Sequence, residues 1–207
     1  SAGIQLSLVL KTPLKENTRV SDFITSYVDD ILAVAEGTED HASEEGGAYT
    51  AAYGITEVAR NRYPKQEGET ARDYAIRVAG EYADQAKEAL GSDVWEKMPG
   101  YMKVVALDIQ YNSSINSNPT FKKNIQKGDY DVALKNTLDI ISVNDPKAGN
   151  IKGTMPGLAK RRAAIYNFAA KEMFLPEIKK VVTSPKEGGG VLTKYLTEKG
   201  NKVFEQP

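Results

Sequence analysis

The sequence predicts an α+β protein that is mainly helical, with one small β-subdomain between helical parts. Apolar residues recur at helical spacing along most of the chain between residues 21 and 169. Residues 38–50 break this pattern, because they are rich in acidic residues, serine and glycine. Gly46-Gly47 is a turn signal, and the stretch from Ala48 to Thr56 can pair back as a short hairpin.

The first helix is expected after an N-terminal extension. Apolar residues alternate with others from Ile4 to Leu10, which predicts a strand there. Ser21 can cap the helix that follows. Its apolar face repeats every three or four residues, through Phe23, Ile24, Val28, Ile31, Leu32 and Ala35. We expect this helix to end at Glu36, with Gly37 as the stop.

Further helices follow from their start signals. Thr70 can cap a long helix, and Pro99 suits the first position of an apolar, central helix. Pro119 and Asp129 then open two shorter helices. After a long loop over residues 142–157, Leu158, Ile165, Tyr166 and Ala169 mark the last strong helix.

The character of the chain changes after Pro176. The run from Ser184 to Gly190 is typical of a flexible linker. Residues 191–207 contain too few apolar side chains for a core of their own. The predicted organisation is therefore an N-terminal extension over 1–20, a domain over 21–175 and a C-terminal extension over 176–207.

Composition excludes several classes of function. The chain is 41% hydrophobic and 27% charged, as in soluble globular proteins. No run of about 18 apolar residues predicts a membrane helix, and no signal peptide is visible. The net charge of -1 provides no basic field for nucleic acid or an anionic membrane. Without cysteine there are no disulfides or thiolate sites, and no cofactor or metal site is expected.

The most informative residues surround the end of the first helix. Glu36 is followed by an acidic loop and then by Thr50, fourteen residues later, in the predicted hairpin. A carboxylic acid, a second carboxylate and a hydroxyl around one cleft are the groups needed to cut a glycosidic bond.

Three sequence blocks follow one another in a fixed order. They are Glu36-Gly37 with Tyr49-Thr50-Ala51-Ala52-Tyr53-Gly54-Ile55-Thr56; Ala106–Asn112 followed by Phe121–Ala133; and Gly157-Leu158-Ala159-Lys160-Arg161-Arg162-Ala163-Ala164. Together, over residues 21–173, they resemble the phage-type lysozymes, the muramidases of the T-even phage kind. The resemblance implies a small β-hairpin lobe and a helical lobe with the cleft between them. It also implies inverting hydrolysis of the β-1,4 bond between N-acetylmuramic acid and N-acetylglucosamine.

The same resemblance assigns Glu36 as the general acid and Thr50 as a residue that positions the attacking water. The position of the second carboxylate differs from the family pattern. The family places an aspartate nine residues after the glutamate and six before the threonine, and no aspartate of this sequence fits both spacings. Here Glu44 lies six before Thr50, and Glu45 lies nine after Glu36. We favour Glu44, because the tight hairpin fixes the register from the threonine side. Asp40 is a third candidate.

Substrate contacts are expected from Tyr53 in the first block and from the central helix, through Gln110, Tyr111 and Asn112. Arg161 and Arg162 can contact the acidic peptide stem of peptidoglycan, and the alternative is structural pairing with an acidic residue of the protein. His41, the one histidine of the chain, is expected to be an exposed loop residue without a catalytic role.

The predicted function is that of an active, phage-encoded muramidase whose partner is peptidoglycan. It would be located in the host cytoplasm before release, or be carried in the virion, and it would act on the cell wall. The alternatives are a catalytically impaired, virion-associated peptidoglycan-binding protein and a lytic transglycosylase, for which Glu36 alone would suffice. The terminal extensions suggest contacts with virion or tail proteins. We expect residues 184–207 to be a tether, the alternative being that they pack on the helical lobe.

Overall fold

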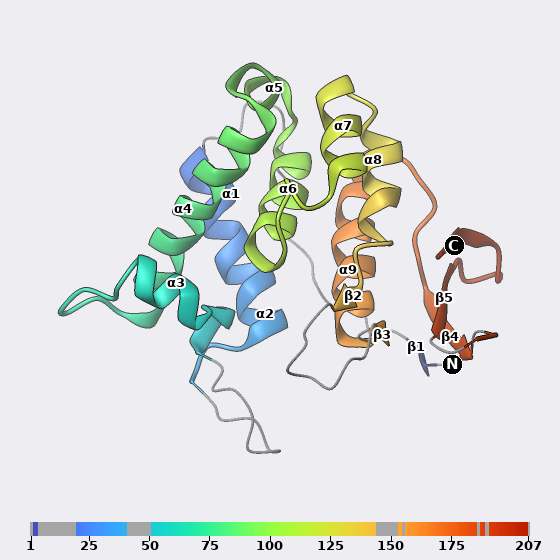
Figure 1. Ribbon diagram of the computed structural model, residues 1–207, viewed down its shortest axis with the longest axis horizontal. Coiled ribbons are helices and arrows are strands. Elements are labelled where there is room, and N and C mark those ends of the chain that lie inside the picture. Colours follow the sequence, from blue (N-terminus) through green and yellow to red (C-terminus); the bar gives the residue numbers. More distant parts are fainter. Residues whose placement is uncertain are drawn as a thin grey trace. The chain divides into compact units, whose positions relative to one another are not determined.

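The computed structural model describes residues 2–3, 20–40, 51–143, 153–154, 156–185, 187–188 and 191–206. These residues are mainly helical and contain two antiparallel sheets, one of four strands and one of two (Figure 1). The predicted α+β, mainly α class is confirmed. The chain divides into two compact units, residues 8–115, and residues 1–7 with 116–207. This division differs from the predicted boundaries near residues 20 and 175.

One continuous helix opens the 8–115 unit. It consists of α1 (Val20–Ser26), a π-helical segment η1 (Tyr27–Leu32) and α2 (Ala33–Glu36), with helical backbone at both junctions. Its buried face holds Phe23, Ile24, Val28, Ile31 and Leu32, as the spacing predicts, together with Tyr27, which was not predicted. Ala35, predicted on the same face, is exposed. The helix ends where Gly37 turns to a φ of 84°, a value that favours glycine. The predicted end at Glu36 is confirmed.

Helices α4 (Ala71–Leu90) and α6 (Gly100–Asn112) form the rest of this core, with α3 (Glu57–Arg62) and α5 (Ser92–Lys97) beside α4 (Figure 1). Thr70 caps α4, since its hydroxyl accepts a hydrogen bond of 3.1 Å from the backbone nitrogen of Asp73. The face of α4 toward the core carries Ala75, Ala79, Ala83 and Ala86, all buried. Buried residues occur on nearly every side of α6, which confirms the prediction of a central helix.

The predicted hairpin is wrong for residues 51–56. Ala52–Gly54 form a 3-10 turn, η2, in which Tyr53 has a φ of 59° and Gly54 a φ of 68°. Two successive left-handed residues turn the chain and cannot continue a strand. Residues 41–50, which hold the rest of the predicted hairpin, lie outside the described residues.

The described part of the second unit contains three helices: α7 (Pro119–Lys127), α8 (Tyr130–Thr137) and α9 (Pro156–Glu172). Pro119 occupies the first turn of α7 as predicted, and Asp129 precedes α8 without a capping side-chain hydrogen bond. Strands β2 (Ser142–Val143) and β3 (Gly153–Thr154) pair within the region predicted as a loop.

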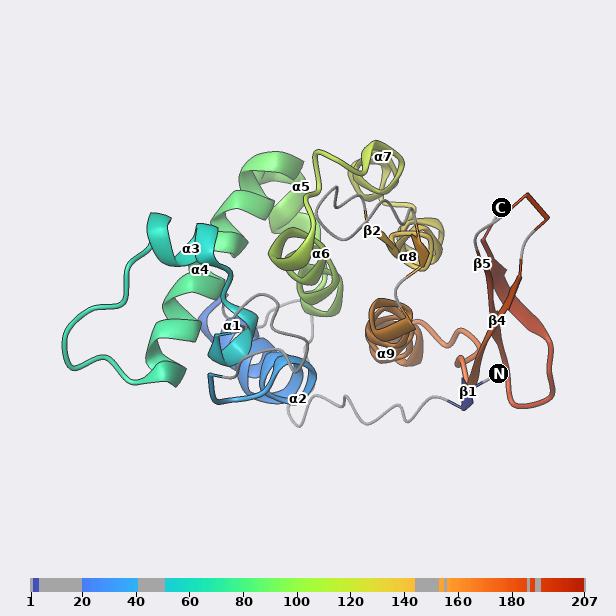
Figure 2. The ribbon, with the colours of Figure 1, turned by 60° about the horizontal axis from the view of Figure 1, so that its bottom comes forward.

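The larger sheet has the order β1-β4-β5-β6. Strands β4 (Lys180–Pro185), β5 (Val191–Leu196) and β6 (Lys202–Glu205) form an antiparallel meander, and β1 (Ala2–Gly3) pairs with β4 (Figure 2). The predicted linker is wrong at its start, because Ser184 and Pro185 pair with Leu192 and Val191. The strand predicted over Ile4–Leu10 lies outside the described residues.

The meander packs on the helices of its own unit. Tyr195 is fully buried, and its hydroxyl donates a hydrogen bond of 2.9 Å to the carbonyl of Leu138 after α8. The side chain of Asn167 in α9 bonds both the nitrogen and the carbonyl of Ile178, each at 2.7 Å. The tail is therefore part of a core, and the expectation of a free tether is corrected in favour of the packing alternative.

No helix among the described residues combines the length and hydropathy needed to cross a bilayer.

Candidate functional site

The end of the first helix is tied to the η2 turn by backbone groups. The nitrogen of Tyr53 donates a hydrogen bond of 2.7 Å to the carbonyl of Gly37. The nitrogen of Ala52 donates one of 2.7 Å to Oδ1 of Asp40. These two bonds bring the turn back over the helix end, which places Glu36 beside it.

The carboxyl group of Glu36 packs directly on the backbone of Gly54. A Cβ atom at position 54 would lie 2.7 Å from Cδ and Cγ of Glu36 and 2.8 Å from Oε2. Real Cβ contacts are not that short, so a side chain at position 54 would displace the Glu36 carboxyl, and the φ of 68° also favours glycine there. Glu36 is therefore the group that approaches the Gly54 backbone most closely.

Glu36 faces a cavity of about 650 Å³ in the 8–115 unit. Its lining combines carboxyl, hydroxyl, amide, guanidinium and phenol groups. The lining residues are Glu36, Ala51, Gly54, Ile55, Thr56, Glu57, Arg60, Tyr82, Tyr111, Asn112 and Ser113.

Tyr111 connects the central helix to the turn. Its hydroxyl donates a hydrogen bond of 2.8 Å to the carbonyl of Tyr53. Its ring lies 5.1 Å from that of Tyr82 and 6.0 Å from that of Tyr27, measured between centroids. Tyr27 is held in turn, since its hydroxyl donates a bond of 2.7 Å to the buried carboxylate of Asp108. Three helices thus fix the aromatic wall of the cavity.

The opposite side of the turn is held by α3. Thr56 caps this helix by accepting a hydrogen bond of 3.2 Å from the nitrogen of Ala59. Nη1 of Arg60 donates a bond of 3.0 Å to the carbonyl of Ile55. Burial raises the pKa of Tyr82, and a hydrogen bond with Thr56 opposes that shift. Its phenol therefore stays protonated at neutral pH and can donate a hydrogen bond.

Of the residues predicted for the site, Glu36, Tyr111 and Asn112 line this cavity. Tyr53 is buried, and its carbonyl accepts the bond from Tyr111. Gln110 braces the helices instead: Nε2 donates to Oε1 of Gln85, and its own Oε1 accepts from the nitrogen of Ile115, both at 3.0 Å.

The remaining site predictions have different outcomes. Arg161 is buried in α9 of the other unit. Glu44, Glu45, Thr50 and His41 lie outside the described residues, so their roles stay predictions. Asp40, the third candidate for the second carboxylate, accepts the bond from Ala52 that holds the turn.

Eight lining residues were not predicted as site residues, and five of them have polar side chains: Thr56, Glu57, Arg60, Tyr82 and Ser113. Thr56 had a usable signal, because a threonine directly before Glu57 and a short helical segment is typical of a helix cap. The sequence carries no comparable signal for Tyr82. This residue lies in α4 and reaches the site only because α4 packs on α6, where its ring contacts that of Tyr111.

The described residues contain no group of three or more histidine, aspartate or glutamate side chains arranged to hold a metal ion. Comparison with family models, with curated proteins and with solved structures gives no match.

Proposed function

We propose that the protein is a muramidase that cuts the β-1,4 bond between N-acetylmuramic acid and N-acetylglucosamine in peptidoglycan, on a lysozyme-like fold. The observation that carries this proposal is the position of Glu36. Its carboxyl group lies on the backbone of Gly54 and lines a cavity of about 650 Å³. A general acid must be held at a fixed place beside the glycosidic oxygen, and this packing supplies the constraint.

The rest of the cavity suits a sugar. The phenols of Tyr82 and Tyr111 combine an apolar ring with a polar tip, and the amide of Asn112 can both donate and accept hydrogen bonds. In this mechanism Glu36 gives its proton to the leaving oxygen while a carboxylate on the far face of the sugar activates water. Glu44 is our first candidate for that carboxylate and Glu45 our second, with Thr50 positioning the water.

Asp40 is less suited to this task. Its Oδ1 is engaged by the backbone of Ala52, so moving it toward a water would release the turn against which Glu36 packs.

The biological setting belongs to the same proposal. We place the protein in a phage, either released from the host cytoplasm at lysis or carried in the virion, and acting on the cell wall. Virion or tail proteins are proposed partners of the terminal extensions. Strand β6 lies at one edge of the larger sheet, and an edge strand can accept a strand from another chain.

The products formed from purified murein test this function. Hydrolysis leaves reducing N-acetylmuramic acid ends, which is the expected result. Ends carrying 1,6-anhydro-muramic acid would identify a transglycosylase instead. Binding to murein without any soluble product would identify a catalytically impaired binding protein.

A further inference from the structure

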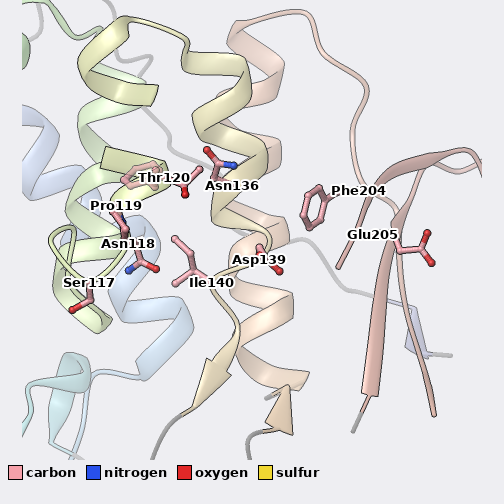
Figure 3. Close-up of a pocket in the computed structure, with 10 residues that line it drawn as sticks. Ser117, Asn118, Pro119, Thr120, Asn136, Asp139, Ile140, Phe204 and Glu205 are labelled. Carbon is pink, nitrogen blue, oxygen red and sulfur yellow. The ribbon is translucent and has the colours of Figure 1, made fainter. Parts of the chain in front are cut away.

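A second cavity, of about 500 Å³, lies within the unit that contains residues 116–207. This volume falls in the range of small-molecule sites, roughly 300–1,000 Å³. Its walls come from the start of α7, the end of α8 and strand β6 (Figure 3). None of its lining residues lines the cavity around Glu36.

One wall is an aromatic ring on β6. Figure 3 shows the ring of Phe204 directed toward the end of α8 and Glu205 directed away from it. The Phe204 ring lies 6.3 Å from the ring of buried Tyr195, which holds it in place. The carboxylate of Glu205 forms an ion pair with Lys202 at 2.7 Å. Phe204 therefore presents a supported apolar surface to the cavity.

The facing wall is polar. Asn136 comes from the end of α8, Asp139 from the residues that follow it, and Asn118 and Thr120 from the start of α7. Oδ1 of Asn136 accepts a hydrogen bond of 2.7 Å from Asn124, which fixes the plane of its amide and leaves Nδ2 as a donor. Planar amide and carboxylate groups each offer two polar atoms, which suits the neighbouring hydroxyl groups of a sugar.

The charge of the lining indicates which ligands can bind. Among the described lining residues, the Asp139 side chain is an acidic group with no basic partner in the lining, because the Glu205 carboxylate points away and is paired with Lys202, and no lysine, arginine or histidine is present. Such a lining repels phosphates and carboxylates. A supported aromatic ring opposite amides, hydroxyls and a carboxylate instead fits an uncharged, polyhydroxylated ring with one apolar face. Phe121 and Ile140 add apolar surface that can receive a methyl group.

We propose that this cavity binds a neutral N-acetylhexosamine unit of a glycan strand, separately from the cavity around Glu36. The ring of Phe204 stacks on the apolar face of the sugar, and Asn136 and Asp139 hold its hydroxyl groups. The identification of the glycan as peptidoglycan rests on the proposed function. The recognition of a neutral sugar by this cavity does not rest on it.

The test is a titration of the full-length Glu36→Gln protein with the tetramer of N-acetylglucosamine, followed by amide NMR. The Glu36→Gln change prevents cleavage during the titration. We expect shifts in residues 117–121, 136–140 and 203–206. Phe204→Leu should weaken binding at these residues by about tenfold or more, by analogy with other aromatic stacking platforms. Phe174→Leu, at a ring that is 97% exposed outside the cavity, should leave binding unchanged.

Two results would overturn the proposal: no shifts in these three segments at millimolar tetramer, or equal weakening by Phe204→Leu and Phe174→Leu. If Phe204→Leu fails to fold, Asp139→Asn provides the same test at an exposed side chain, and unchanged binding in that variant would count against the site. The tetramer result is independent of murein cleavage by the wild-type protein. Cleavage can fail while the tetramer still binds here, and then the proposed function falls and this inference stands.

Discussion

At the scale of single residues, the site depends on one glycine. Gly54 satisfies two conditions at once: a left-handed backbone and the absence of a Cβ where the Glu36 carboxyl lies. The other contacts of the turn, from Tyr111 and Asp40, fix the backbone on which that carboxyl rests. Changes at these positions should therefore alter catalysis by moving Glu36.

Gly54→Ala should reduce murein hydrolysis by about a hundredfold or more, because displacement of a catalytic group by about 1 Å can cost that much. The new Cβ would push the Glu36 carboxyl from its place, and an alanine at a φ of 68° is strained. Gly80→Ala is the matched control. Gly80 lies within α4 with nothing within 4 Å of an added Cβ, so alanine should preserve activity and leave stability equal or higher. Equal rates for both variants would contradict the assigned role of Gly54.

Tyr111→Phe removes the hydroxyl that donates to the carbonyl of Tyr53. The buried carbonyl then loses a partner, which should lower the free energy of unfolding by about 1–3 kcal/mol in a urea titration. Hydrolysis should fall as well, because the turn beneath Glu36 loosens. Unchanged stability together with unchanged activity would show that this bond does not hold the turn.

At the scale of elements, two segments without helix are held by specific side chains. The connection between α3 and α4 is closed by Glu69, whose carboxylate takes two hydrogen bonds of 2.9 Å from Arg77 and one of 3.0 Å from the nitrogen of Gln66. The C-terminal meander is fixed by Tyr195, buried against the residues that follow α8.

The Glu69 contacts predict a pH dependence. The hydrogen bonds from Arg77, and then from Gln66, lower the pKa of Glu69 from 4.5 to about 2. A carboxyl with a lowered folded pKa stabilises the fold above its unfolded pKa, and this contribution is lost as the pH falls. The difference in melting temperature between wild type and Glu69→Gln should therefore be full near neutral pH and shrink between about pH 4.5 and 2. A difference that stays constant or grows toward low pH would contradict this reading.

Tyr195→Ala tests whether the meander belongs to the core. Removing this buried ring should cost about 3–5 kcal/mol, as for other large aromatic residues. In a chain of this size about 1 kcal/mol corresponds to 2–4 °C, so thermal melting should fall by roughly 6–20 °C. Phe174→Ala removes a ring that is 97% exposed and should change melting little. Equal melting temperatures for the two variants would show that residues 184–207 are a free tether and do not belong to the core.

At the scale of the whole molecule, the sequence predicts the helices better than their surroundings. Gly37, Thr70 and Pro119 mark helix ends through local backbone chemistry, and the structure agrees at each. The turn at Tyr53 was missed because a non-glycine residue adopts a left-handed φ there only with support from tertiary contacts such as the Tyr111 bond.

The meander was missed for a related reason. Its few apolar residues cannot form a core alone, but Tyr195 buries itself on a helical surface that the local sequence does not reveal. The candidate site divides in the same way. Glu36 and Gly54 both belong to the first sequence block, so the sequence indicates them. Tyr82 and Arg60 reach the cavity only through packing between elements.

The central claim is that Glu36 is the general acid, and the rate of murein hydrolysis by Glu36→Gln tests it most directly. Glutamine keeps the shape of the side chain and removes its proton, so the rate should fall by about 10²–10⁴-fold or more. Glu57→Gln is the matched control, because it removes an exposed carboxyl from the same cavity. Its activity should stay within a few-fold of wild type, and both variants should melt like the wild-type protein. Near-wild-type turnover in Glu36→Gln, or an equal loss in Glu57→Gln, would contradict the assignment.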